Sequence, residues 1–485
     1  MDFGTIDLGL AGIGVAVVYL AGVATAVDAI MNARTPQGAT AWVFALATIP
    51  LVALPTYWIV GRFKFEDYLT ALREFDSEIA SGLEDAKKGP LKPFLIDNDG
   101  HSDGRETGEM RAFDEMATVP FTSGNDVRLL IDGEATFEAL FQAIDAAEDY
   151  VLTQFYIVRD DAIGQRYKRH LIAAARRGVT VRFLYDTVGS IKLPRGYKKE
   201  LEAAGVCVCP FTGPRNWLKK LRLNFRNHRK ITVVDGRVGF VGGLNVGDEY
   251  LGHTEDFPHW RDTHLRVEGP LVQGLQLSFA RDWFYGTREE IDGLVWEPEA
   301  AEADRTALVL ASGPADKLET CGLLYSHAIE SAEERVWIAT PYFVPDGRVL
   351  GALQLAALRG VDVRVIMPRE SDSVFFKWVP YATLPEVERA GVKVFLYEPG
   401  FMHQKVALVD GDFAAVGTAN FDNRSFRLNF EATVVTKDVE TCDNVAAMLE
   451  RDFARATRIH SDDLESKSFA FRFAANATQL LAPVL

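Results

Sequence analysis

The stretch NHRKITVVDGRVGFVGGLN, from Asn227 to Asn245, decides the fold of this chain because its pattern occurs a second time. The second copy is MHQKVALVDGDFAAVGTAN, from Met402 to Asn420. Each copy reads His-x-Lys, then Asp-Gly, then Gly-x-x-Asn, and the internal spacing of the two copies is identical. A single His-x-Lys would carry little weight, since isolated motif matches are often accidental. Two copies with the same three-part spacing indicate an internal repeat.

The residues after each His-x-Lys predict a β-strand followed by a tight turn. Apolar runs follow both lysines, over Ile231–Val234 and Val406–Val409. Because side chains alternate faces along a strand, the His and Lys of each copy point to the same side. An Asp-Gly pair between two apolar runs is a hairpin signal. The local pattern therefore favours a structural role for Asp235 and Asp410, which lie at the turns.

The repeated pattern resembles the signature HxKxxxxDxxxxxxGxxN of the phospholipase D superfamily, and both copies hold every invariant position of that signature. The resemblance implies a catalytic set made of the His, Lys and Asp positions: His228, Lys230, Asp235, His403, Lys405 and Asp410. It implies that the substrate-binding pocket is completed by Asn245, Asn420, Asp262 and Glu431. Acids downstream of the motif orient the histidines in relatives, and Asp262 and Glu431 are the matching positions. The alternative for both is an ordinary buried carboxylate in a hydrogen-bond network.

Length, charge and cysteine content restrict the class of protein. A chain of 485 residues can hold two domains with attachments. Its net charge of −16 argues against a general nucleic-acid-binding protein, which usually carries an excess of basic residues. The four cysteines include Cys207-x-Cys209, and buried free thiols in a reducing compartment are the simplest interpretation. No spacing of His, Asp, Glu or Cys suggests a metal site, and we expect no cofactor.

The N-terminal segment, residues 1–64, predicts a transmembrane helical hairpin with helices over about residues 8–28 and 39–60. Both runs are apolar and long enough to cross a bilayer, and Pro50 and Pro55 would kink the second helix. A cleaved signal peptide fits less well, because no Lys or Arg precedes the first run. A buried hairpin in a soluble core also fits such long runs less well. The positive charges that follow the second helix place the catalytic part on the cytoplasmic side of the cell membrane.

The rest of the chain divides into a connector, residues 65–119, and two α/β lobes, residues 120–300 and 301–485. The lobes repeat the same alternation of strands and helices, which predicts mixed sheets covered by helices. Four of the predicted helices end at a glycine suited to the C′ position: Gly178, Gly205, Gly360 and Gly391. The resemblance implies that the lobes pack about a pseudo-twofold axis, with the active site at their interface. In the connector we expect short helices around residues 66–83 and a disordered piece around residues 99–108.

Two histidines and two lysines at one interface suit the chemistry of a phosphodiester. A neutral imidazole can attack phosphorus and form a covalent phosphoryl-enzyme, while a protonated partner delivers a proton to the leaving alkoxide. The lysines supply positive charge for the phosphate oxygens. The resemblance assigns the attack to His228 and the general acid/base role to His403. The sequence alone does not decide that order.

A closer resemblance links the chain to bacterial cardiolipin synthases of the phospholipase D type. It rests on the hairpin with Arg34-Thr35-Pro36 and on runs spread over nearly the whole chain: residues 185–190, 242–250, 340–346, 420–426 and 480–485. It implies a membrane-bound enzyme that transfers a phosphatidyl group from one phosphatidylglycerol to another and yields cardiolipin and glycerol. The long, acid-rich connector departs from the family pattern.

Other functions stay open at this point. A phospholipase D that hydrolyses phospholipids to phosphatidic acid, or a transferase with phosphatidylethanolamine as donor, would carry the same motifs. A nuclease of the superfamily would need neither the hairpin nor the acidic charge, and a non-catalytic scaffold would not need both His-x-Lys units.

The expected partners are phosphatidylglycerol and cardiolipin in the bilayer, with no nucleic acid. The oligomeric state is open, and a homodimer is one option. Residues 215–226 and 374–381 mix basic, aromatic and aliphatic side chains and could contact lipid headgroups. The alternatives are a solvated loop for the first segment and a buried helix start for the second.

Overall fold

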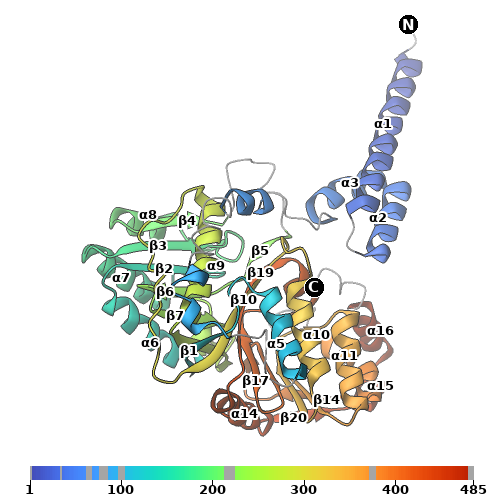
Figure 1. Ribbon diagram of the computed structural model, residues 1–485. Coiled ribbons are helices and arrows are strands. Elements are labelled where there is room, and N and C mark those ends of the chain that lie inside the picture. The colour runs from blue at the N-terminus through green and yellow to red at the C-terminus, as the bar shows by residue number, and fades with distance from the viewer. Residues whose placement is uncertain are drawn as a thin grey trace.

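The computed structural model describes residues 3–32, 35–61, 68–75, 86–96, 104–211, 224–370 and 378–478. A long helix, α1, stands away from a body of two α/β lobes that lie side by side (Figure 1). Most of the two segments predicted to contact headgroups, and the C-terminal run 480–485, lie outside the described residues.

In the described part of the chain, sixteen strands form one sheet that runs through both lobes. The first lobe supplies β1 (Thr122–Ile131), β2 (Tyr150–Phe155), β3 (Thr180–Tyr185), β4 (Cys207–Pro210), β5 (Arg226–Asn227), β6 (Ile231–Val234), β7 (Val238–Gly242) and β9 (Thr263–Glu268). The second lobe supplies β10 (Arg305–Ser312), β11 (Arg335–Ala339), β13 (Asp362–Pro368), β14 (Lys393–Tyr397), β16 (Val406–Val409), β17 (Phe413–Gly417), β19 (Asn429–Thr436) and β20 (Ala456–Ile459). Two smaller sheets pair β8 (Trp260–Arg261) with β15 (Phe401–Met402) and β12 (Phe343–Val344) with β18 (Phe421–Asp422).

The strand order of the second lobe mirrors that of the first. From one edge the order is β4-β3-β2-β6-β7-β9-β1, and it continues as β10-β19-β17-β16-β11-β13-β14-β20. Corresponding neighbours have the same direction: β2–β3 and β11–β13 are parallel, whereas β6–β7 and β16–β17 are antiparallel. The predicted fold of two mixed α/β lobes related by a pseudo-twofold is confirmed. The lobes do not keep separate sheets, because β1 and β10 pair antiparallel at the centre and so remove two exposed sheet edges.

Helices cover the sheet in both lobes (Figure 1). The first lobe has α6 (Asp132–Ala146), α7 (Ala162–Arg176), α8 (Arg195–Ala203), the 3₁₀ turn η4 (Asp248–Leu251) and α9 (Leu271–Thr287). The second has α10 (Thr320–Ser331), α11 (Gly347–Leu358), α12 (Val379–Arg389), α13 (Asn423–Arg427), α14 (Val439–Phe453), α15 (Ser461–Glu465) and α16 (Phe469–Thr478). The four glycines predicted to end helices have positive φ between 93° and 103°, as a left-handed C′ residue requires.

The predicted connector contributes to both cores. Residues 68–75 are helical, and Tyr68 and Phe75 are buried in the core of the first lobe. The 3₁₀ turn η2 (Lys92–Phe94) follows, and then α5 (Gly104–Met116) packs on α10 of the second lobe and buries Phe113. The disorder predicted for residues 104–108 is therefore wrong, because the apolar face of α5 covers the second lobe, while residues 97–103 lie outside the described part.

The N-terminal segment differs in part from the predicted hairpin. It forms α1 (Phe3–Asn32), α2 (Pro36–Thr48), α3 (Pro50–Thr56) and a π-helical turn, Tyr57–Gly61. The single helix predicted over residues 39–60 breaks at Ile49, which has φ −135° and ψ 55°, because a residue before proline is disfavoured in the helical region. Tyr57 donates a hydrogen bond to Asp28 (2.7 Å), which ties the π-helical turn to α1.

One helix of the described residues is long and apolar enough to cross a membrane. It covers Gly12–Asn32, with a mean hydropathy of 2.0. Its large apolar side chains are exposed: Ile13, Val15, Val17, Leu20, Val23, Val27, Ile30 and Met31. A soluble domain would bury such a surface, so the exposure fits contact with lipid. The second crossing of the predicted hairpin is not confirmed.

Candidate active site

His228 is placed by a short strand that crosses to the second lobe. β5, directly before His228, pairs in parallel with β19, and the backbone N–H of His228 donates to the carbonyl oxygen of Phe430 (3.0 Å). The pairing puts His228 beside the next residue of β19, Glu431. The ring nitrogen Nδ1 of His228 lies 2.9 and 3.0 Å from the two carboxylate oxygens of Glu431.

His403 is placed in the same way, by a short strand of the second lobe that pairs with the first lobe. β15, directly before His403, pairs in parallel with β8 of the first lobe. The backbone N–H of His403 donates to the carbonyl oxygen of Arg261 (2.8 Å), and its Nδ1 lies 2.9 Å from Oδ2 of Asp262. Each histidine is therefore held by a carboxylate that belongs to the other lobe.

Asp262 and Glu431 lie behind the imidazole rings and are not among the residues that line the cavity. Both carboxylates are 0% exposed, so direct contact with substrate is not expected, whereas contact with Nδ1 is the arrangement that the resemblance implied for acids downstream of the motif. A carboxylate at Nδ1 accepts the ring proton there and leaves Nε2 as the nitrogen for chemistry.

The two orienting acids differ in their bonding. Glu431 also accepts hydrogen bonds from Thr418 Oγ1 (2.5 Å), Ser425 Oγ (2.9 Å) and Asn429 Nδ2 (3.1 Å). Burial alone would raise the pKa of Glu431, but the neighbouring His228 and its hydrogen bond outweigh burial and lower it. Glu431 is therefore held as an anion.

Asp262 sits in a more apolar environment. Its carboxylate accepts hydrogen bonds from Thr263 N (2.8 Å) and Trp260 Nε1 (3.3 Å) besides the contact with His403. Burial raises the pKa of Asp262, and the charge of Lys405 offsets this only in part.

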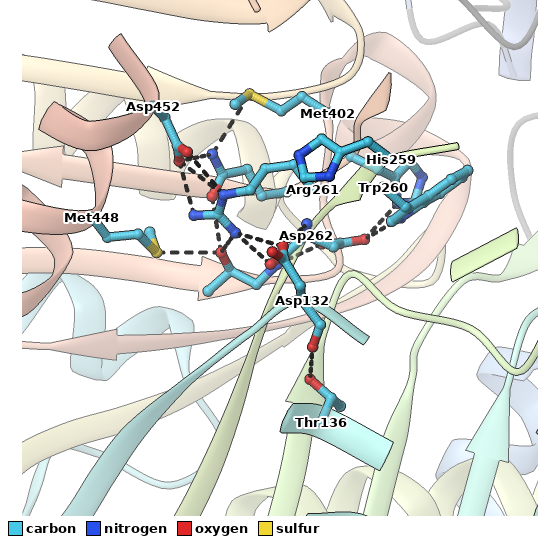
Figure 2. A network of polar contacts seen from close by, with 12 residues as sticks. Asp132, Thr136, His259, Trp260, Arg261, Asp262, Met402, Met448 and Asp452 are labelled. Atoms are coloured by element: carbon cyan, nitrogen blue, oxygen red, sulfur yellow. Dashed lines mark hydrogen bonds and ion pairs between the residues drawn. The ribbon is translucent and has the colours of Figure 1, made fainter. Parts of the chain in front are cut away.

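The backbone of Asp262 is locked by a buried ionic network, which Figure 2 shows. The guanidinium of Arg261 lies between two carboxylates, at 2.8 Å from Asp452 on α14 and 3.2 Å from Asp132. Gln404 of the second motif also donates to Asp452 (2.8 Å). The network joins both lobes directly behind the half-site of His403.

The motif lysines lie beneath the histidines. Nζ of Lys230 donates to the carbonyl oxygen of His228 (2.7 Å), and Nζ of Lys405 donates to the carbonyl oxygen of His403. Both side chains are buried. Burial lowers the pKa of Lys230 to about 7, against the opposing effect of Glu431. Each lysine therefore supports the backbone of its own histidine and brings positive charge close to it.

A cavity of about 420 Å³ lies between the lobes, and both histidines line it. Asn245 and Asn420, predicted to complete the pocket, line it as well. The other lining residues are Tyr156, Ile157, Arg226, Tyr250, Trp260, Tyr342, Asp422, Arg424 and Asn429. Asn245 accepts a hydrogen bond from Ile157 N (3.0 Å) and donates one to Tyr250 Oη (3.0 Å), so its amide has a fixed orientation.

The surroundings of both imidazoles favour their neutral form. Burial lowers the pKa of His228 to about 4, although Glu431 raises it. Burial, together with the charges of Lys405 and Lys230, holds the pKa of His403 well below its usual value. A neutral imidazole is the form that can act as nucleophile or base.

Asp235 and Asp410 lie away from the cavity. The carboxylate of Asp235 accepts three hydrogen bonds from the backbone N–H groups of residues 148–150, at 2.7–2.9 Å, and Asp410 accepts the same three from residues 333–335. Both residues have a left-handed φ, 52° and 51°, at the Asp-Gly turn. Their place in the catalytic set is therefore corrected: they hold the chain where β2 and β11 begin, as the hairpin pattern indicated.

Sequence comparisons agree with this arrangement. The family model described as "Cardiolipin synthase, PLD-like domain" matches residues 140–283 and 325–454. Cardiolipin synthase A of Pseudomonas fluorescens is 42% identical over 471 residues, which cover 97% of this chain and 98% of that protein. The chain belongs to the cardiolipin synthase family of phospholipase D-like proteins. Cardiolipin synthase A of Pseudomonas aeruginosa is also similar, with 44% identity over 483 residues that cover 99% of this chain and 97% of that protein.

A solved structure supports the fold of the family lobes. Phosphatidylserine synthase of Haemophilus influenzae superposes with a TM-score of 0.57, at 14% identity, over 78% of this chain and 100% of that chain. At this identity the similarity concerns the fold alone.

The sequence did not single out the other residues that line the cavity of this family member. Tyr156 follows β2, and Tyr342 lies shortly after β11, the corresponding strand of the second lobe, so a comparison of the two halves could have found them. Arg226 and Asn429 meet only because β5 pairs with β19, and no local pattern predicts that pairing. The four cysteines are free, but Cys207 is exposed and not buried as predicted, because β4 forms an edge of the sheet.

Proposed function

We propose that the chain is a membrane-bound cardiolipin synthase that transfers a phosphatidyl group from one phosphatidylglycerol to a second, with release of glycerol. The observation that carries the proposal is the pair of motif histidines on one cavity, each held at Nδ1 by a carboxylate of the opposite lobe. Such a pair can divide nucleophilic attack from proton transfer. The full-length similarity to cardiolipin synthases supports the lipid substrate.

In the first step Nε2 of His228 attacks the phosphorus of the donor lipid and the bond to the glycerol oxygen breaks. His403 delivers a proton to that oxygen, so glycerol leaves as a neutral alcohol. The negative charge of the bound phosphodiester raises the pKa of the nearby imidazole and so favours the protonated form of His403. The assignment of the attack to His228 follows the resemblance to the superfamily.

The electrostatics around His228 support its role as nucleophile. Attack through Nε2 leaves positive charge on the ring, and Nδ1–H donates to Glu431, whose pKa is lowered. An anionic carboxylate stabilises that charge as it develops. Lys230 and Lys405 add positive charge for the non-bridging oxygens of the phosphate.

In the second step the phosphohistidine meets the hydroxyl group of another phosphatidylglycerol. His403 takes the proton of that hydroxyl, the new P–O bond forms, and the N–P bond to His228 breaks. Attachment of the enzyme to the bilayer raises the local concentration of the lipid acceptor relative to soluble alcohols.

We place the lobes on the cytoplasmic side of the cell membrane, with α1 as the anchor and Arg62 and Lys64 beyond the apolar segment. A multi-pass arrangement through α2 and α3 is part of this proposal. The exposed Cys207 allows a test with a membrane-impermeant thiol reagent. Labelling only after permeabilisation of the inner membrane supports the proposal, whereas labelling of intact spheroplasts contradicts it.

Product analysis tests the reaction. The purified protein is given phosphatidylglycerol vesicles, and the lipid products and free glycerol are resolved by mass spectrometry. Cardiolipin together with an equal amount of glycerol is expected. Phosphatidic acid without cardiolipin would show that water is the acceptor and would overturn the transferase assignment.

A further inference from the structure

The two halves of the cavity carry different side chains on the same backbone. The β5–β19 pairing sets Arg226 opposite Asn429 beside His228, whereas the β15–β8 pairing sets Phe401 opposite Trp260 beside His403. The Trp260 ring centroid lies 5.2 Å from that of His403. The half at His228 is therefore polar and cationic, and the half at His403 is aromatic.

Two arginines, one from each lobe, line the polar half. Arg226 belongs to β5, and Arg424 of α13 donates through Nη2 to the carbonyl oxygen of Asn224 (2.8 Å), two residues before Arg226. The guanidinium groups are close enough to influence each other: burial and the charge of Arg424 both lower the pKa of Arg226, against the opposing effect of Asp186. Two neighbouring cations in a half-buried cavity indicate an anionic ligand.

Two carboxylates near the arginines also hold the backbone around the cavity. Asp186 accepts hydrogen bonds from the backbone N–H groups of Val188, Gly189 and Asn227, at 2.8–3.1 Å, and its charge raises the pKa of Arg226. Asp422 accepts hydrogen bonds from Ser425 N (2.7 Å) and from the side chain of Asn420.

Two buried amide oxygens add a second, independent feature. Oδ1 of Asn420 and Oδ1 of Asn429 have no hydrogen-bond partner in the described part of the chain, and both residues are 5% exposed and line the cavity. The amide orientations are set, because Nδ2 of Asn420 donates to Asp422 (3.1 Å) and Nδ2 of Asn429 donates to Glu431 (3.1 Å). A buried acceptor without a donor is costly, so a ligand that supplies hydrogen-bond donors such as hydroxyl groups suits these two oxygens.

Charge balance distinguishes this subsite from the donor site. In the second step of the proposed reaction the cavity holds the phosphohistidine and the phosphodiester of the acceptor lipid, and each carries a negative charge. The motif lysines donate to the carbonyl oxygens of the histidines, and burial lowers the pKa of Lys230 to about 7, so they are not placed to bind the second phosphate. Other cations that line the cavity are required for it.

We propose that Arg226 and Arg424, with the amide oxygens of Asn420 and Asn429, form a subsite for the phosphoglycerol headgroup of the acceptor lipid. The arginines bind its phosphate, and the amide oxygens accept hydrogen bonds from its glycerol hydroxyl groups. One of these hydroxyl groups attacks the phosphohistidine. A choline headgroup brings no hydroxyl donor, and the cationic headgroups of choline and ethanolamine lipids are repelled by the arginines. The inference rests on the proposed function and names the acceptor that this function requires.

The test measures how one phosphatidyl-enzyme divides among three acceptors. Full-length protein in phosphatidylglycerol vesicles receives isotope-labelled glycerol, so that water yields phosphatidic acid, glycerol yields labelled phosphatidylglycerol, and lipid yields cardiolipin. Ratios among these products do not depend on how fast the intermediate forms or on how much enzyme is folded. The variants are Arg226→Gln, Arg424→Gln and Asn429→Leu, with Arg195→Gln, an exposed arginine of α8, as matched control.

The arginine variants should lower the ratio of cardiolipin to labelled phosphatidylglycerol about tenfold, because only the lipid acceptor carries a phosphate. Arg424→Lys should restore part of that loss, since it keeps the charge. Asn429→Leu should instead lower both transfer products relative to phosphatidic acid, because glycerol and the lipid share the hydroxyl groups. The control should keep the wild-type ratios.

Unchanged ratios with all three products reduced together would overturn the subsite, because that pattern belongs to a role in binding the donor. Failure of the proposed function is distinguishable: the wild-type enzyme would then form no cardiolipin, whatever the variants do.

Discussion

The two halves of the active site share one backbone arrangement and differ in what surrounds the histidine. Each His follows a short strand that pairs across the lobes, and each meets a buried carboxylate there. His228 has polar neighbours and an acid with a lowered pKa, whereas His403 is packed by aromatic rings and faces an acid with a raised pKa. A duplicated fold therefore supplies two similar positions, and the neighbouring side chains adapt them to two different tasks.

A buried arginine lies behind each histidine, and the two arginines occupy different places in the sequence. In the first half it comes from the motif itself, as Arg229, which lies 2.8 Å from Asp282 on α9. In the second half the motif has Gln404 at that place, and Arg261 of the opposite lobe makes the equivalent contact with Asp452 on α14 (Figure 2). An ion pair therefore lies behind both half-sites, within the first lobe in one case and across the two lobes in the other.

The largest expected effect comes from removal of either histidine. His228→Ala and His403→Ala should each lower cardiolipin synthesis roughly 10⁴-fold, because the nucleophile and the proton donor act as a unit. A donor lipid with a nitrophenol headgroup separates nucleophilic attack from proton transfer, since nitrophenolate leaves without a proton. His403→Ala should then give a burst of nitrophenol and His228→Ala none, measured by absorbance. A burst only in His228→Ala would exchange the roles of the two histidines.

The next effect concerns the orienting acids. Glu431→Gln should lower turnover roughly 10²–10³-fold, because a neutral amide has only one acceptor oxygen in place of two and cannot stabilise the positive charge on His228. Asp262→Asn should cost less, since His403 transfers protons and does not carry the covalent phosphoryl group. Steady-state rates of the two variants show which loss is larger, and circular dichroism checks that both proteins are folded to the same extent. Equal losses would mean that the two halves are electrostatically equivalent.

A pH profile sharpens the difference between the half-sites. His228 must be neutral to attack, and its pKa of about 4 places the acid limb of kcat/KM near that value, well below the usual imidazole range. Activity should therefore persist as the pH falls and be lost only on passing about 4, with recovery on return to neutral pH as the control for unfolding. Glu431→Gln should move this limb to still lower pH, because Glu431 raises the pKa of His228. An acid limb near 6.5 would contradict the burial of His228.

The smallest effect on turnover belongs to the signature aspartates. Asp235→Asn and Asp410→Asn each weaken three hydrogen bonds to backbone N–H groups at the start of a strand, so a loss of about 1–3 kcal/mol in the free energy of unfolding is expected. The folded variants should keep turnover within about threefold, measured beside thermal unfolding. A large loss of activity at unchanged stability would return these residues to the catalytic set.

Local structure could be predicted closely from the sequence. Apolar runs, Asp-Gly turns and helix-ending glycines are short-range signals, and the predicted strands over Ile231–Val234 and Val406–Val409 are β6 and β16 as observed. A kink at Pro50 was predicted, but the complete break of the helix at Ile49 and the packing of α5 were not. The first depends on how one proline interrupts a helix, and the second on a partner surface more than 200 residues away in the chain.

The sequence by itself determined the repeat, the two His-x-Lys units, the apolar N-terminal helix and the family, because each of these depends on residue types at short, regular spacing. Only the tertiary structure decided which acid holds which histidine and which arginines and amides share the cavity with the histidines. Those relations join residues of opposite lobes through β5–β19 and β15–β8, each pair only two residues long. Strands so short carry no pattern of their own, and their pairing follows from the way the two lobes pack.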